Sequence, residues 1–469
     1  MTSLTSSSKQ ASKWNLLLAA RKEEQLMLAL QEAPLIEVAS FLEQHPLDLC
    51  LRLFLLFKTN TQALLFGHLH EGRQKTLYRA FSRTAFACIF VEMEPDLRAD
   101  FYQKLDEIGQ AKLLPYLPKQ VRQDVVMLSA YSPTQAGGIM RTDFVTLDYK
   151  MNAEAALNKV RQEAPSEKMI YQLYVVNEEK KMVGMVSLNN LIMANPLTKL
   201  TKFLQENVVA VKVKSDRELV AQQIEKYDLL TLPVINEEGQ LLGVVTHDDA
   251  MEVIRAEQTE DMERFMGIVS DEAKGGYLQA SSFSHFKKRI SWMILLFCCS
   301  FAAGLLLHHY DGLLQHMAIL ALYMPTINDA GGNAGSQAAM VVIRALSLGE
   351  LSHKQWPRIL WKEVKVALLF ASCFFPLALF KVYLLSGLLA KNYGSHLPLP
   401  AKGLWGLALT VSMALSLQII TSILIGAALP LVIHALGKDP ALAASPAITT
   451  IVDMTGLFFY FSIASYLLL

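Results

Sequence analysis

The sequence predicts a multi-domain membrane protein with an α-helical N-terminal superhelix, a duplicated α/β region and an all-α bundle of five transmembrane helices. Three observations support this prediction. The 469 residues are 52% hydrophobic and only 18% charged, whereas soluble chains have about 25% charged residues. Only six of the 43 acidic residues follow Ile290, where long apolar runs begin. A segment that occurs twice precedes these runs.

The first 130 residues have a helical pattern. Leu, Phe and Ala recur at three- and four-residue spacing, and β-branched runs are few. Prolines such as Pro46, Pro95 and Pro118 divide this region into short pieces. Stacked short helices, as in an α-solenoid, fit this pattern best.

The next region contains an internal repeat. Segment 174–187 matches segment 233–246 at a constant offset, and each copy reads as strand, acidic turn, strand and helix. Ser187 and Thr246 stand where each of those helices would be capped. This pattern looks like a tandem pair of CBS domains, a regulatory module that binds ligands. The alternative is an α/β repeat that only dimerises.

Five apolar runs predict membrane spans, because a hydrocarbon core of about 30 Å requires about 20 residues of helix. The expected spans are 290–309, 314–345, 364–387, 404–433 and 442–468. Basic residues gather before the first span, between the second and third, and after the fourth. No signal peptide opens the sequence. By the positive-inside rule, the N-terminus is cytoplasmic and the C-terminus lies outside.

The second span carries an unusual polar segment, Pro325–Gln337. It combines Gly331, Gly332 and Gly335 with polar side chains that include Asp329 and Asn333. Such a segment is tolerated at membrane depth only when it is buried in protein or lines a watery cavity. A simple packing seam between two helices is the alternative, since Gly331 and Gly335 form a GxxxG pair.

The last span contains one acidic residue, Asp453, in an otherwise apolar helix. An aspartate there costs about 2.5–3.5 kcal/mol on insertion and is a functional-site hypothesis by default. Lys381, in the third span, is the cation that could pair with Asp453, but we expect it to extend towards the interface. A carboxylate in a cavity favours a hard cation such as Mg²⁺, which prefers oxygen ligands.

These residues carry a resemblance to the MgtE family of magnesium channels, together with segments 344–350 and 439–443. The resemblance implies a homodimer with a pore between the subunits, lined by the second and fifth spans. It also implies that Asp453 selects the ion and Asn333 is a polar pore group. The implied domains are a helical N domain (1–130), two CBS domains (131–200 and 201–263), a plug-like connecting helix (264–289) and a transmembrane domain (290–469). The implied pore residues are Pro325, Asp329, Gly331, Gly332, Asn333, Gly335 and Asp453.

The family resemblance also implies inhibition by cytoplasmic Mg²⁺. The acids that match the regulatory positions are Asp216, Glu218, Asp228, Asp249, Glu252, Glu257, Glu260 and Asp261. Clustered carboxylates repel one another until divalent cations bridge them. The alternative is a solvated helix face. The first repeat departs from the family pattern at Asn189, Asn190 and Asn195, where acids or arginine are common in the family.

The predicted function is Mg²⁺-selective import across the cell (inner) membrane by a homodimer surrounded by lipid. Two alternatives stay open: transport of another divalent cation such as Mn²⁺ or Co²⁺, and a membrane-anchored CBS sensor of nucleotides. An adenine nucleotide at the CBS pair is a further expectation. Zero net charge without a basic tract argues against a nucleic-acid partner. The absence of catalytic motifs argues against an enzyme.

Overall fold

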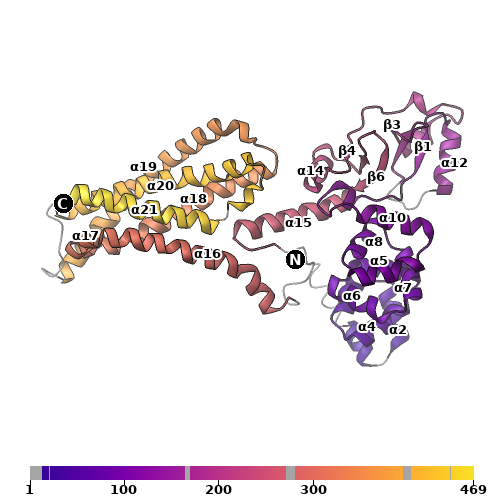
Figure 1. The fold of residues 1–469 in the computed structure, drawn as a ribbon, viewed down its shortest axis with the longest axis horizontal. Helices are drawn as coiled ribbons and strands as arrows, with labels where there is room; N and C mark the ends of the chain where they lie inside the picture. The colour runs from indigo at the N-terminus through magenta and orange to yellow at the C-terminus, as the bar shows by residue number, and fades with distance from the viewer. Residues whose placement is uncertain are drawn as a thin grey trace. The chain divides into compact units, whose positions relative to one another are not determined.

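The structure is a computed structural model that describes residues 13–20, 22–163, 170–270, 280–393, 403–443 and 445–468. The chain divides into two compact units. One extends to Glu257, and the other begins at Gln258. Figure 1 shows the elements of both units with their labels.

Short stacked helices form the first half of the first unit (Figure 1). They are α2 (Glu23–Gln31), α3 (Leu35–Glu43), α4 (Leu47–Leu55), α5 (Thr59–His68), α6 (Glu71–Ala80), α7 (Arg83–Val91), α8 (Pro95–Gln103), α9 (Glu107–Leu113) and α10 (Lys119–Ser129). Local sequence explains several starts. The Ser82 hydroxyl accepts a hydrogen bond from the Ala85 amide, and Pro95 occupies the first turn of α8, where a missing N–H costs nothing.

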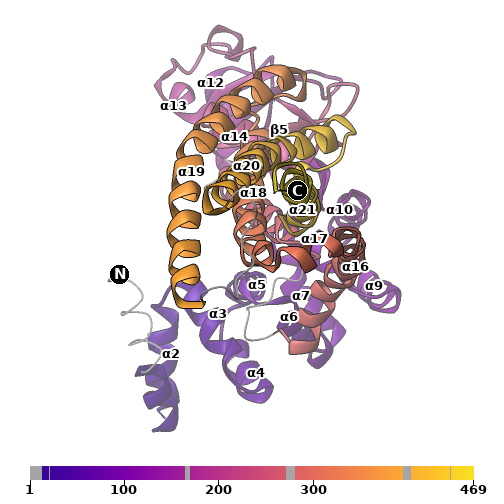
Figure 2. The ribbon, with the colours of Figure 1, turned by 90° about the vertical axis from the view of Figure 1, so that its left-hand side faces the viewer.

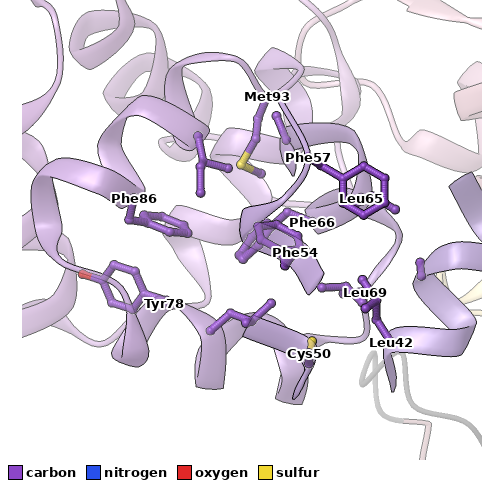
Figure 3. Close-up of a cluster of buried hydrophobic side chains, with 14 of the residues drawn as sticks. Leu42, Cys50, Phe54, Phe57, Leu65, Phe66, Leu69, Tyr78, Phe86 and Met93 are labelled. Atoms are coloured by element: carbon purple, nitrogen blue, oxygen red, sulfur yellow. The ribbon is translucent and has the colours of Figure 1, made fainter. Parts of the chain in front are cut away.

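Aromatic side chains fill the core of this helical stack, as Figure 3 shows. Phe54, Phe66 and Phe86 are wholly buried. The ring of Phe66 meets those of Phe86 and Phe101 edge to face, with centroids 5.3 and 5.1 Å apart, a geometry that aromatic pairs prefer. The predicted helical N-terminal region is therefore confirmed.

Two small sheets follow, and they share one topology. The first contains β1 (Thr146–Asp148), β2 (Gln172–Val176) and β3 (Met182–Ser187); the second contains β4 (Val211–Lys212), β5 (Thr231–Ile235) and β6 (Leu241–Thr246). In each sheet the first pair of strands is parallel and the second antiparallel, with an irregularity at the equivalent position. Associated helices are α11 (Ala136–Ile139), α12 (Ala153–Glu163), α13 (Leu188–Met193), α14 (Arg217–Tyr227) and α15 (His247–Phe265).

The two copies of the repeat contact each other directly. The Tyr174 and Thr231 hydroxyl oxygens lie 2.6 Å apart in a buried hydrogen bond. Their hairpin turns also bond, since the Met182 amide donates to the Gly239 carbonyl at 3.0 Å. Gly239 has φ of +81°, and its counterpart Lys180 has φ of +61°, so only the second copy places glycine in this left-handed turn position. Each copy therefore buries one face against its twin.

Five long helices dominate the second unit. They are α16 (Ser282–His309), α18 (Met324–Ser347), α19 (Trp356–Tyr393), α20 (Gly403–Ala435) and α21 (Ser445–Leu468), with the shorter α17 (Asp311–His316) and η4 (Ala318–Leu322) before α18. Helix α20 packs against α18, α19 and α21, and α18 also packs against α21. Figure 2, which views the bundle nearly end-on, shows α20 and α18 beside α21.

The second predicted span, 314–345, is not a single helix. Helix α17 ends at His316, the next residue, Met317, has non-helical backbone angles, and α18 starts only at Met324. Pro325 stands in the first turn of α18, so it begins a helix and does not free a carbonyl within one. The plug-like connecting helix expected over 264–289 lies partly outside the described residues, which here comprise the end of α15, the non-helical residues 266–270 and 280–281, and the first turns of α16.

Four of the described helices are long and apolar enough to cross a membrane. They are α16, α20 and α21 over their full lengths and residues 356–388 of α19. Helix α18 fails this criterion because of its polar segment, although its 24 residues extend for about 36 Å. The second unit is therefore a membrane region, with α18 as its polar helix.

Candidate ion pathway

The three glycines of α18 lie where this helix meets α20 and α21. A Cβ on Gly331 would stand 2.6 Å from the Gln418 Nε2 and 2.9 Å from Val452. A Cβ on Gly332 would stand 3.0 Å from the Thr449 methyl, and one on Gly335 3.1 Å from both Ile448 and the Ser422 carbonyl. The glycines thus permit close helix approach. These contacts agree with a packing seam between helices at the glycines, and they leave the polar side chains of α18 to be explained.

Those polar side chains occupy another face of α18. Asp329, Asn333 and Gln337 are exposed at intervals of four residues, so they form one stripe along the helix. The Asn333 amide donates to the Asp329 carboxylate at 3.2 Å. Lipid cannot satisfy such groups, so this stripe requires water or another protein surface. We call these three residues the α18 stripe.

Asp453 lies on α21, which packs against α18. Thr449, one helical turn before it, faces Gly332 of α18. Asp453 is partly exposed, and within the described part of the chain its carboxylate has no cationic partner. Lys381 instead donates to the Thr326 hydroxyl at 3.2 Å. The structure therefore places a carboxylate without a cationic partner on α21, the helix that packs against α18.

Gly335→Leu is expected to reduce ion uptake strongly. The new side chain would push α18 away from Ile448 of α21 and from the Ser422 carbonyl of α20, and overpacking of this kind costs about 1–3 kcal/mol. Uptake into proteoliposomes and thermal stability of the purified protein check this. Gly304→Leu on α16 is the matched control, because a Cβ there meets nothing within 4 Å. Equal uptake by the two variants would contradict the packing role.

The acids predicted as regulatory sites are spread over several elements. Asp216 caps α14 by accepting from the Glu218 amide at 2.8 Å, and Asp228 ends that helix in a left-handed conformation. Glu257 accepts from the Arg217 Nε at 2.7 Å. Glu252 lies on α15. Among the described residues, no group of three His, Cys, Asp or Glu side chains is placed to hold a metal ion.

The last turns of α15 contact the membrane bundle within the second unit. Arg264 forms ion pairs with Glu260 on its own helix and with Asp439 in the α20–α21 loop. The Ser347 hydroxyl, at the end of α18, donates to Asp261 at 3.1 Å. Two of the predicted regulatory acids thus lie where α15 meets the ends of the two helices that carry the candidate pathway.

Asp249 takes part in a cluster that the sequence did not reveal. Burial and then the charge of Asp249 raise the pKa of Asp96, on α8, to about 8, and one Asp96 oxygen is buried without a hydrogen-bond partner among the described residues. Burial also raises the pKa of Asp249, to about 6, against a hydrogen bond from Thr246. Arg141 lies beside them and bonds Asp143 at 3.2 Å.

The charge of Asp249, on the second repeat, therefore acts on Asp96 of the helical domain. Arg141 is almost fully buried, and its guanidinium lies 3.1 Å from the Glu94 carboxylate. Asp96 precedes Asp249 by a long stretch of chain, and no local spacing connects them. The sequence signal that could have pointed to Asp96 is an acid in the first turn of a helix, which is too common to be informative.

Taken together, a helical domain, a duplicated α/β region and a membrane bundle whose polar helix packs against a helix with an unneutralised carboxylate are characteristic of regulated membrane transporters for cations. Family models match three parts of the chain: divalent cation transporter over 324–463, MgtE intracellular N domain over 33–134, and CBS domain over 136–196 and 201–256.

Curated proteins match across most of the chain. Magnesium transporter MgtE of Thermus thermophilus is 35% identical over 366 residues, which cover 78% of this chain and 77% of that protein. Magnesium transporter MgtE of Bacillus subtilis is 28% identical over 402 residues, which cover 86% and 84%. This chain therefore belongs to the MgtE family.

Solved structures also resemble the chain. The soluble part of a magnesium transporter is 28% identical, with a TM-score of 0.49, and covers 54% of this chain and 99% of its own. The cytosolic domain of the Mg²⁺ channel MgtE in complex with ATP is 29% identical, with a TM-score of 0.49, and covers 52% and 99%.

Proposed function

We propose that this chain carries Mg²⁺ across the cell membrane through a pathway lined by α18 and α21. The observation that carries this proposal is Asp453, a carboxylate without a cationic partner among the described residues, on a membrane helix that packs against α18. Mg²⁺ is hard and sheds its waters reluctantly. A carboxylate with amide and hydroxyl groups nearby suits an ion that keeps part of its hydration shell.

The proposed pathway needs a second copy of the chain. Within one chain the stripe of Asp329, Asn333 and Gln337 is exposed, and such groups are costly against lipid. In a homodimer with the two stripes face to face, each stripe would border a water-filled surface. The dimer would also bring two Asp453 carboxylates to the ion. Five spans would leave the two ends of the chain on opposite sides of the membrane, and the distribution of basic residues supports a cytoplasmic N-terminus and an external C-terminus.

Cytoplasmic Mg²⁺ regulates this pathway in our proposal. The regulatory acids are those predicted from the sequence, with Asp96 added as the partner of Asp249. The contacts of Arg264 with Asp439 and of Asp261 with Ser347 support a direct link from α15 to the membrane helices. An adenine nucleotide at the CBS pair is a further ligand that we propose, supported by the match of both repeats to CBS domains.

Divalent-cation uptake by the purified protein in liposomes tests the proposal. Mg²⁺ should enter at a rate that Mn²⁺, Co²⁺ and Ca²⁺ do not match, because the site is suited to a small hydrated ion. Dye-loaded liposomes with each ion in turn provide the measurement, and protein-free liposomes are the control. Preference for Mn²⁺ or Co²⁺ would favour the alternative transporter, and no flux of any ion would favour a membrane-anchored sensor.

A further inference from the structure

A buried glutamine on α20 makes an unusual bond to the helix that carries Asp453. Gln418 is fully buried, with 0% of its surface exposed. Its Nε2 donates to the Val452 carbonyl of α21 at 2.6 Å. Within an α-helix that carbonyl already accepts from the amide four residues later. The Gln418 bond is therefore an additional tie between α20 and α21, at the residue directly before Asp453.

Two glycines make room for the Gln418 carboxamide. A Cβ on Gly331 of α18 would lie 2.6 Å from its Nε2, and a Cβ on Gly456 of α21 would lie 2.7 Å from the same atom. Gly456 stands one helical turn after Val452. Helices α18, α20 and α21 thus meet around the Gln418 side-chain amide. Gly331 of α18 and Gly456 of α21, which have no side chains, leave the space that this amide occupies.

An apolar residue would pack this position at a lower cost. Burying an amide costs about 1–3 kcal/mol for each polar atom left without a partner, and the Gln418 Oε1 has no partner among the described residues. The Asn328 Oδ1, 3.3 Å from the same Gly456 Cβ position, is also buried without a donor among them. Packing alone does not explain a polar group here, whereas a directional bond to one carbonyl does.

We propose that Gln418 is a positioning residue that sets the height and rotation of α21, and through them the place of the Asp453 carboxylate. The inference rests on the proposed function, in which Asp453 meets the ion. A small rotation of α21 would move Asp453 around the helix axis, and apolar contacts resist such a rotation less specifically than a hydrogen bond does, because they are not directional. The bond from Gln418 fixes that rotation one residue away from the carboxylate.

Gln418→Met tests the inference, because methionine has a similar length and no donor. Loss of one hydrogen bond of about 1.4 kcal/mol corresponds to about a tenfold change in a binding constant. The Mg²⁺ concentration at half-maximal uptake should rise about tenfold and the preference for Mg²⁺ over Ca²⁺ should fall, while maximal uptake changes little. Gly456→Ala presses on the same amide from α21 and should shift half-saturation in the same direction.

Ser412→Ala is the matched control. Ser412 is equally buried on α20, but its hydroxyl donates to the Ala408 carbonyl of its own helix at 2.7 Å. It should retain wild-type half-saturation and selectivity. The inference is overturned if Gln418→Met and Gly456→Ala fold and keep wild-type half-saturation, or if they lower only stability and maximal uptake. If Asp453→Asn itself keeps normal uptake and selectivity, the proposed function fails first, so the two failures are distinguishable.

Discussion

Asp453→Asn is expected to abolish Mg²⁺-selective uptake while leaving a folded membrane protein. At 4 Å, two unit charges interact by about 1–4 kcal/mol between water and a protein surface, and a divalent ion doubles this energy. Because about 1.4 kcal/mol is a factor of ten, the loss of affinity should be tenfold at the least. Uptake of Mg²⁺ and Ca²⁺ into proteoliposomes, compared with wild type, provides the measurement.

The fold should tolerate this change well. A lone aspartate costs about 2.5–3.5 kcal/mol on membrane insertion, and asparagine keeps its shape without the charge. Asp311→Asn on α17 is the matched control, because this exposed acid accepts from Gln315 on its own helix and lies outside α18 and α21. Thermal stability and oligomeric state should be unchanged in both variants. Near-normal Mg²⁺ uptake with unchanged selectivity in Asp453→Asn would contradict the role of this carboxylate.

The sequence predicted those features of the structure that depend on local pattern. Ser187 starts α13 and accepts from the Asn190 amide, as its position before the helix suggested. The polar segment of α18 and the lone Asp453 were detectable from the sequence because polar and charged residues are costly inside a membrane and are therefore rare there without a function. In each case the signal lies within one helix or one turn, so a single segment is enough to detect it.

The features that the sequence missed join distant segments. The charge of Asp249 acts on Asp96 of α8, and the hydrogen-bond acceptor of Gln418 is a backbone carbonyl on α21. Neither pair has a spacing that a helix or a strand imposes. The second span was predicted as a single segment over 314–345, whereas α17 ends at His316 and α18 starts at Met324. Tertiary packing decides such details, and hydropathy does not encode them.

Acidic conditions are expected to dock the helical domain onto the repeat pair without Mg²⁺. Burial raises the pKa of Asp96 to about 8 and that of Asp249 to about 6 in the docked form, above the ordinary value of about 3.9. An acid with a raised pKa binds protons on docking, so the docked form gains stability as pH falls through these values and loses it as pH rises. Each proton taken up changes the docking constant by up to about tenfold per pH unit.

Limited proteolysis of the full-length protein at pH 6 and pH 8, with Mg²⁺ titrated at each pH, measures this effect. At pH 8 Asp249 is ionised and Asp96 is about half ionised in the docked form, so the two carboxylates repel each other more than at pH 6 and protection between the domains should depend more strongly on Mg²⁺. At pH 6 a shared proton replaces the cation, and protection should be nearly independent of Mg²⁺. If cytoplasmic Mg²⁺ inhibits the pathway by this docking, uptake should also be inhibited at pH 6 on the cytoplasmic side.

Asp96→Asn combined with Asp249→Asn should remove both dependences, because two neutral amides neither repel each other nor attract Mg²⁺. Arg141, Glu94, Arg98 and Asp248 also act electrostatically on this pair, and they stay in place in the variant. Asp100→Asn is the control on the same helix, since Asp100 only pairs with Lys104 at 3.6 Å on the surface, and such pairs contribute little. If the double variant kept the wild-type dependence on pH and Mg²⁺, the regulatory charges would have to lie elsewhere, among the other acids of α14 and α15.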